Sequence, residues 1–193
     1  PITFEGNASG ETVYWMGIQI EYAGASAFME TSSVYDTPNE AYFTDDGGAT
    51  WTSGLANFGA DMHGVVTFSG QCEIVDDGGG GSGDVCSQGT ESNNIENGWG
   101  NVSLLTYAND FVVAQNEEFT LEQFSVNFLL NPGQPIVSAD IYFYEDTGGN
   151  GPGAEIPGTS SLGVVPDSQQ AVGSHPAGFD LIQGVWTLAT PIT

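Results

Sequence analysis

The side chains of this sequence that could bind a ligand are almost all oxygen donors. Glu145, Asp146 and Asn150 lie in a glycine-rich segment, with oxygen atoms spaced as at the start of a calcium-binding loop. The bidentate glutamate that closes such a loop is absent, because Pro157 stands at its position. Two interpretations stay open here, an ordinary glycine-rich turn and a calcium site formed by Glu145, Asp146 and Asn150.

A second motif matches the Asp-box pattern Ser/Thr-x-Asp-x-Gly-x-Thr-Trp at Thr44, Asp46, Gly48, Thr50 and Trp51. In sialidases and related sugar-processing proteins this box is a hairpin turn remote from the catalytic site. We expect Asp46 to accept backbone N–H groups, Gly48 to adopt a dihedral angle that other residues avoid, and Trp51 to anchor the turn in the core. A sialidase also needs arginines for its substrate's carboxylate, and the chain has none, so that activity is excluded.

Cys72 and Cys86 flank a segment that is rich in glycine and aspartate. Two thiols are too few for a structural zinc site, and they predict a disulfide of the kind found in secreted proteins. A disulfide closing this loop stabilises a chain by about 3 kcal/mol in the chain-entropy model. The composition of 72–86 is typical of a linker, with β-sandwich parts at 1–71 and 87–193 on its two sides.

Tryptophans and sequons offer sites for carbohydrate. Trp15 and Trp186 lie in apolar strands and are expected in the core, whereas Trp99, between two glycines, is expected to be exposed and free to stack on a sugar ring. Asn7 and Asn101 begin Asn-x-Ser sequons and are candidate glycosylation sites.

The sequence predicts no catalytic residue. His63 and His175 are the only histidines, and they are far apart in the chain. Carboxylates are abundant, but no spacing singles out a pair for glycoside hydrolysis and no nucleophile–base pair is recognisable. We therefore predict that the chain is not an enzyme.

The charge balance excludes whole classes of function. Lys plus Arg is 0 and Asp plus Glu is 25, which gives a formal net charge of −25. Nucleic acids and anionic membranes are bound through basic side chains, so neither is expected as a partner. Each carboxylate must face water, accept hydrogen bonds, stay protonated or coordinate a cation, which makes calcium a candidate cofactor. Loss of every Lys and Arg indicates selection, for which exposure to trypsin-like proteases outside the cell or a saline setting is a sufficient cause.

Short apolar segments separated by turn residues predict an all-β fold, an antiparallel β-sandwich or jelly roll. No segment sustains an apolar stripe of helical period. The expected strands are 12–22, 41–44, 64–68, 111–113, 119–121, 124–130, 141–144 and 185–188.

The tripeptide Pro-Ile-Thr stands at both 1–3 and 191–193, which indicates a repeat module of a tandem array. Joined end to end, 185–193 would run into Phe4 and Glu5 as one strand and a turn. Residues 1–71 would then complete the module of a neighbouring copy. Alternatively, 1–71 and 87–193 pack together and 72–86 is a surface loop.

Several short motifs resemble modules of large secreted proteins of Bacteroidota, including the long adhesins of gliding flavobacteria. They are 86–98, 108–113, 141–146, Tyr14-Trp15 and Asp45-Asp46-Gly47-Gly48. The resemblance implies a β-sandwich in an exported cell-surface or filament protein, and it implies no catalytic residues.

Two functions are therefore expected. The first is a structural repeat unit of an extracellular filament or giant cell-surface adhesin, with neighbouring copies of the same module as partners. The alternative is a calcium-dependent carbohydrate-binding module of a secreted polysaccharide-degrading protein, with surface polysaccharide as its ligand.

Overall fold

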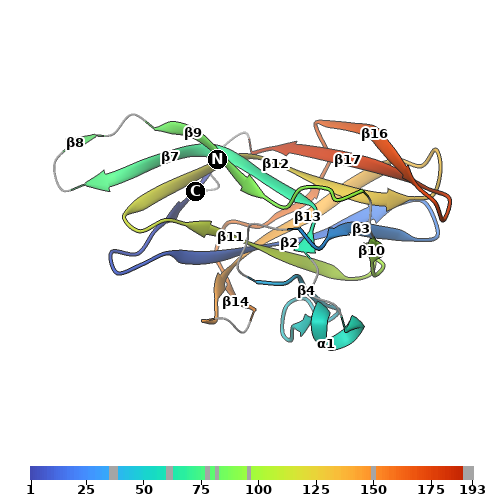
Figure 1. Cartoon of the computed structure of the whole chain (residues 1–193), viewed down its shortest axis with the longest axis horizontal. Helices are drawn as coiled ribbons and strands as arrows, with labels where there is room; N and C mark the ends of the chain where they lie inside the picture. Colours follow the sequence, from blue (N-terminus) through green and yellow to red (C-terminus); the bar gives the residue numbers. More distant parts are fainter. Residues whose placement is uncertain are drawn as a thin grey trace.

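The computed structural model describes residues 1–34, 39–59, 63–76, 79–80, 83–94, 97–148 and 151–188. The fold is all-β, as predicted, with antiparallel strands in two facing sheets and a five-residue helix, α1 (Gly54–Phe58). Figure 1 shows the strands running along the long axis, with α1 at one side.

The smaller sheet is built around β2, whose alternating residues turn Ile18 and Ile20 into the core. Its strand order is β14 (Pro152–Glu155), β13 (Ile136–Asp146), β2 (Thr12–Tyr22), β11 (Thr106–Val113), β4 (Tyr42–Thr44) and β5 (Thr52–Ser53), with β15 (Ser161–Val164) also paired to β13.

The larger sheet is built around β12 (Glu117–Leu130). Its main path is β10 (Asn97–Trp99), β3 (Ala27–Ser32), β12, β17 (Phe179–Thr187) and β16 (Ser168–His175). Further strands pair off this path, namely β1 (Ile2–Glu5), β6 (His63–Gly64), β7 (Val66–Asp76), β8 (Gly79–Gly80) and β9 (Asp84–Gly89).

Strand β12 joins the two strands predicted at 119–121 and 124–130. Phe119 and Leu121 are buried before the join, and Phe124 is buried after it, so the core-facing positions shift by one residue. Glu122 and Gln123 are both exposed between them, as expected for a β-bulge. In the sequence, these two consecutive polar residues separate the apolar segments 119–121 and 124–130, so the pattern predicts two strands where the structure has one.

Aromatic side chains fill the space between the sheets. Trp186 stacks on Phe124 with ring centroids 5.3 Å apart and is 1% exposed. Phe111 contacts Phe4, Phe68 and Phe119 from the opposite sheet. The burial predicted for Trp15 and Trp186 is confirmed, although Trp15 belongs to a separate cluster on the outer face of the smaller sheet.

Residues 1–71 and 87–193 share this core. Strand β2 pairs with β11 on one side and with β13 on the other, and β12 pairs with β1, β3 and β7. The described residues of the two parts therefore pack together within one chain. The segment predicted as a linker supplies the end of β7 and the start of β9, in a hairpin that projects from one end of the molecule (Figure 1).

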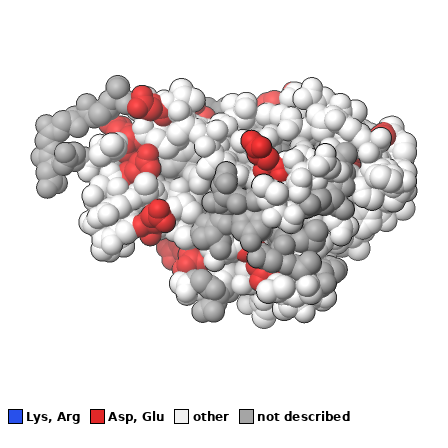
Figure 2. Space-filling model, viewed as in Figure 1, with Lys and Arg blue, Asp and Glu red and all other residues white. Residues whose placement is uncertain are grey.

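Carboxylates are spread over the molecular surface. Figure 2 shows separate acidic patches on one face, with no basic side chain among them. Glu30 and Asp110 are the buried carboxylates of the described part of the chain. No helix in that part is long and apolar enough to span a membrane.

Candidate functional site

The first candidate site is one edge of β12, where the first and last described strands of the chain meet. Strand β17 pairs antiparallel with this edge from Leu130↔Asp180 to Gln123↔Thr187. The N–H of Leu188 then donates to the carbonyl of Glu122 at 2.7 Å, which extends the ladder by one residue pair.

Strand β1 continues the same ladder. It pairs antiparallel with β12 from Ile2↔Leu121 to Glu5↔Glu118, and the N–H of Gly6 donates to the carbonyl of Glu117 at 2.6 Å. The position after Leu188 along β12 is therefore taken by Ile2. We call the edge formed by residues 117–130 of β12, with β17 and β1 aligned on it, the junction edge.

Hydrogen bonding places β1 and β17 on the same side of β12. Strand β7 pairs with β12 at the positions that β1 occupies, so β1 and β7 take opposite sides. By the same argument β3 lies opposite β17. Val65 directly precedes β7, bonds to Glu30 of β3 and accepts from the N–H of Asn127, so β7 shares the side of β3. Strand β1 is thus left on the side of β17.

The side chains of β1 fit the core tightly. Ile2 and Phe4 are buried, and the ring of Phe4 lies 4.9 Å from those of Tyr14 and Phe111. Thr3 faces outward, and its hydroxyl lies 2.9 Å from that of Thr120. Among the described strands, β1 pairs only with β12. A cavity of about 220 Å³, lined by Ile156 and other side chains, lies beside β1.

The turn between β1 and β2 is held by close backbone contacts. A Cβ atom on Gly6 would lie 1.9 Å from the carbonyl oxygen of Ala114, so only glycine fits without a shift. Asn7 accepts hydrogen bonds at its Oδ1 from the N–H and the hydroxyl of Ser9. This is the first predicted sequon, and its Asn7 is exposed.

The Asp box forms the predicted turn. Asp46 accepts hydrogen bonds from the hydroxyl of Thr44 at 2.6 Å, and from the N–H and the hydroxyl of Thr50 at 3.0 and 2.7 Å. The hydrogen bond from the hydroxyl of Thr44 contributes most to holding the pKa of the Asp46 carboxyl well below its ordinary value of 3.8. The hydrogen bonds from the hydroxyl and the N–H of Thr50 act in the same direction. Gly48 has φ of 91°, in the left-handed region, as predicted.

Trp51 anchors this turn, but outside the main core. Its ring packs edge-on against Tyr144, with centroids 5.1 Å apart, on the outer face of the smaller sheet. Trp15 and Tyr144 are thereby buried in a second cluster, and the indole N–H of Trp15 donates to Asp146 at 2.9 Å. The expectation that Trp51 enters the core is therefore corrected.

A small cavity lies beside the Asp box. It has a volume of about 190 Å³ and is bordered by Gln19, Asp45, Leu104, Tyr142 and Tyr144. It is smaller than the roughly 300 Å³ typical of sites for drug-sized ligands. Its phenolic rings and amide group are the kinds of group that contact a single sugar ring.

The segment considered for calcium begins as a turn. Asp146 accepts at one oxygen from Trp15 and at the other from the N–H of Gly148, at 2.6 Å. Glu145 is the preceding residue in β13, so its side chain points to the opposite face of the strand. Asn150 lies outside the described residues. Within the described ranges, no group of three or more His, Cys, Asp or Glu side chains is arranged to hold a metal ion.

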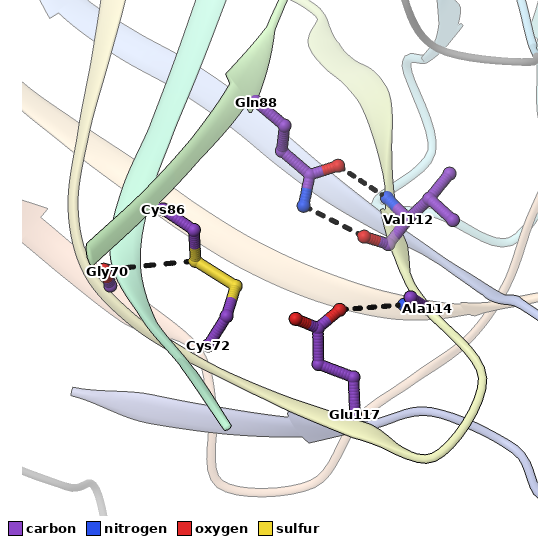
Figure 3. Close-up of a disulfide and its surroundings, with 7 residues drawn as sticks. All are labelled: Gly70, Cys72, Cys86, Gln88, Val112, Ala114 and Glu117. Atoms are coloured by element: carbon purple, nitrogen blue, oxygen red, sulfur yellow. Dashed lines mark hydrogen bonds between the residues drawn. A yellow bond between two sulfur atoms is a disulfide. The ribbon is translucent and has the colours of Figure 1, made fainter. Parts of the chain in front are cut away.

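The predicted disulfide between Cys72 and Cys86 is present. It links β7 to β9 within the projecting hairpin, as Figure 3 shows. The amide of Gln88 in β9 donates to the carbonyl of Val112 and accepts from its N–H, at 2.9 and 2.8 Å. Strand β9 is thus tied to β11 of the other sheet. Nothing in the sequence around Gln88 marks this role.

The prediction that Trp99 is exposed is wrong. Its side chain is 3% exposed and packs near Tyr107, and a Cβ atom on Gly54 would lie 1.2 Å from its ring. The flanking glycines, which suggested an exposed loop, instead allow close approach of the chain. Trp99 is not accessible to a sugar in this structure.

The second sequon and the histidines have structural settings. The Oδ1 of Asn101 accepts from the hydroxyl and the N–H of Ser103, and Asn101 is half-buried. His63 is buried in β6, and His175 accepts at Nδ1 from the N–H of Ala177. The two histidines therefore lie in separate parts of the fold.

A buried polar network was not foreseen from the sequence. The carboxylate of Glu30, 0% exposed, accepts from the hydroxyl of Ser92 at 2.5 Å and from the amide of Asn127 at 2.8 Å. Gln183 of β17 donates to the Oδ1 of Asn127 at 3.3 Å. Ordinary strand residues surround Glu30 in the sequence, so only the pairing of β3 with β12 reveals this set.

Comparison with known proteins gave no match among protein-family models, curated proteins or solved structures.

Proposed function

We propose that the chain is a structural repeat unit of an extracellular filament or giant cell-surface adhesin. The observation that carries this proposal is the junction edge, on which Leu188 and Ile2 take adjacent positions of one ladder and run in the same direction. The end of the described chain therefore lies beside the site of β1, at the place where a following copy would begin. The recurrence of Pro-Ile-Thr at 191–193 supports the same reading.

Two further features support an extracellular setting. The disulfide between Cys72 and Cys86 is typical of oxidising compartments. A chain without Lys or Arg offers no cleavage site to trypsin-like proteases. The resemblance to secreted Bacteroidota modules agrees with both, and neighbouring copies of the module are the partners that we propose.

The mass of the native species tests this proposal. The native material is boiled in detergent without reductant, with and without trypsin, and separated by electrophoresis. A trypsin-resistant band many times the mass of one 193-residue chain is expected for covalently linked copies. A single band at the mass of one chain would contradict tandem linkage.

The cavity beside the Asp box favours a second candidate function, binding of a carbohydrate such as a surface polysaccharide. Tyr142 and Tyr144 border this cavity together with Gln19. Isothermal titration calorimetry with bacterial and algal polysaccharides, with calcium or with chelator, tests it. Binding that Tyr142→Ala abolishes would support a carbohydrate-binding module, and dependence on calcium would support the proposed cofactor.

A further inference from the structure

We propose that β1 is exchanged between copies, so that Pro1–Glu5 of one copy occupies the junction edge of the preceding copy. This inference rests on the proposed function in one respect, namely that copies of the chain adjoin one another. It adds the partner surface and the way in which it is filled.

The alignment of β17 with β1 is the first reason. Leu188 is hydrogen-bonded to Glu122, and Ile2 stands opposite Leu121, so the end of β17 lies next to the β1 site on β12. Both strands are antiparallel to β12, so no reversal of the chain is needed. In covalently joined copies, β1 of the following copy would therefore be tethered close to the β1 site of the preceding one.

The second reason is that β1 has backbone pairing with a single strand. Among the described strands it pairs with β12 alone, through four residue pairs. Its apolar contacts are made by Ile2 and Phe4, while Thr3 and Glu5 are exposed. The next strand, β2, belongs to the other sheet, so residues 6–11 connect the two sheets, and an exchanged β1 would leave its own chain through this connection.

The third reason is that the site is specific for this strand. Phe4 fills a space bounded by Tyr14, Phe111 and Phe143, and an empty site would expose those rings to water. A strand with an apolar residue at the positions of Ile2 and Phe4 is required there. The occupant that we propose is β1 of a second copy, which has the same sequence as the β1 that fills the site in this structure.

Cysteine pairs at directly opposite positions can detect the exchange. Thr3 and Thr120 are paired across β1 and β12, with their hydroxyls 2.9 Å apart. Since Gly6 and Glu117 are joined by a hydrogen bond, Thr3 and Thr120 form a non-hydrogen-bonded pair, in which side chains approach closely. Chains carrying Thr3→Cys are mixed with chains carrying Thr120→Cys, unfolded, refolded together at high protein concentration and oxidised.

A matched control uses the neighbouring strand on the same edge. Gln123 and Thr187 are also directly opposite, their side chains are 3.3 Å apart, and both are exposed. Their pair is likewise non-hydrogen-bonded, because Leu188 and Glu122 share the adjacent bond. Chains with Gln123→Cys are therefore mixed with chains with Thr187→Cys and treated in the same way.

The proposal expects a disulfide between positions 3 and 120 of different chains, several-fold more abundant than the control linkage and increasing with protein concentration. Mass spectrometry of glutamate-specific digests identifies the linked positions. Equal and low yields of both linkages would overturn the exchange, provided that the double variant Thr3→Cys/Thr120→Cys closes within one chain. Failure of that double variant to close would overturn it too, because β1 would not lie opposite Thr120. A large native mass without exchange would leave the repeat unit standing and remove the exchange alone.

Discussion

Carboxylate side chains of this protein are satisfied by hydrogen bonds from neighbouring polar groups rather than by ion pairs with Lys or Arg. With no Lys or Arg in the sequence, Asp46 is satisfied by Thr44 and Thr50, and Glu30 by Ser92 and Asn127. Hydrogen bonds to a charged acceptor are stronger than those between neutral groups. The acidic side chains thus have specific structural tasks as well as a place on the surface.

Acid should weaken the Asp box. The folded pKa of Asp46 lies below its ordinary value of 3.8, so its contribution to stability is complete above that pH and is lost as the pH falls toward the folded pKa. Asp46→Asn should therefore lower Tm at neutral pH, and its difference from the wild type should narrow below about pH 4. Calorimetry from pH 7 to pH 2 measures this.

Asp45→Asn is the control for Asp46, because it removes the same formal charge and leaves the acceptor of Thr44 and Thr50 in place. The Tm difference for Asp46→Asn should exceed that for Asp45→Asn at neutral pH. Equal differences at every pH would show that charge alone, and not the hydrogen bonds of the turn, determines the effect.

The buried pair of Glu30 and Asn127 should be strongly coupled. Glu30→Ala leaves the buried amide of Asn127 without its acceptor, which should cost about 1–3 kcal/mol of the free energy of unfolding. A double-mutant cycle with Asn127→Ala should give a coupling of about 1–2 kcal/mol in urea unfolding.

The same cycle on Glu21 and Ser138 provides a control, since their side chains are hydrogen-bonded at 3.0 Å and Glu21 is exposed. Exposure to water should hold that coupling below about 0.5 kcal/mol. A larger coupling there than at Glu30 would contradict the assignment of Glu30 to a buried network.

At the scale of the elements, β1 is short and still contributes a large part of one end of the core. Phe4, in the middle of this four-residue strand, contacts the rings of Tyr14 and Phe111 in the facing sheet. The position of β1 depends on the turn that follows it, where the backbone of Gly6 lies against that of Ala114. The stability of this end of the sandwich is therefore sensitive to one glycine.

Gly6→Ala should destabilise the fold by about 3 kcal/mol, because the new methyl group would meet the carbonyl oxygen of Ala114 at 1.9 Å. Gly10→Ala is the matched control in the same turn, as nothing lies within 4 Å of its Cβ position. The control should change the free energy of unfolding by less than about 0.5 kcal/mol. Urea unfolding that ranks the two variants equally would place β1 elsewhere than on β12.

The strands at 12–22 and 141–144, the disulfide and the Asp-box turn were predictable because each is encoded locally, whereas strands such as β3, β9 and β16 were not predicted. Alternation defines β2, two cysteines define one disulfide, and the spacing from Thr44 to Trp51 defines the turn. The pairing of β1 with β12 and the burial of Trp99 were not predictable, because they depend on strand order and on contacts between distant segments.

At the scale of the whole molecule, a formal charge of −25 must be balanced by solvent and counterions. Self-repulsion of like charges lowers the stability of a compact chain, and no basic side chain relieves it here. Burial of apolar and aromatic surface between the sheets has to offset this repulsion. Added salt should therefore stabilise this fold, whereas it weakens a protein that is held by surface ion pairs.

Tm should increase with NaCl, with most of the increase below about 0.2 M, because the Debye length falls to about 8 Å near 0.15 M. The strengthening of hydrophobic burial by salt instead grows steadily at higher concentrations. The shape of the curve of Tm against NaCl concentration therefore distinguishes the two effects. A Tm that is constant or falling over the low range would contradict net self-repulsion.

Both ends of the described chain lie on one edge of β12, and residue-resolved amide hydrogen exchange can test this arrangement without any substitution. The N–H groups of Gly6 and Leu188 are bonded to the carbonyls of Glu117 and Glu122. Both amides should be protected from exchange far more strongly than the amide of Ser9 in the exposed turn. Exchange of either amide at the rate of an unstructured peptide would show that β1 or the end of β17 is not docked on β12.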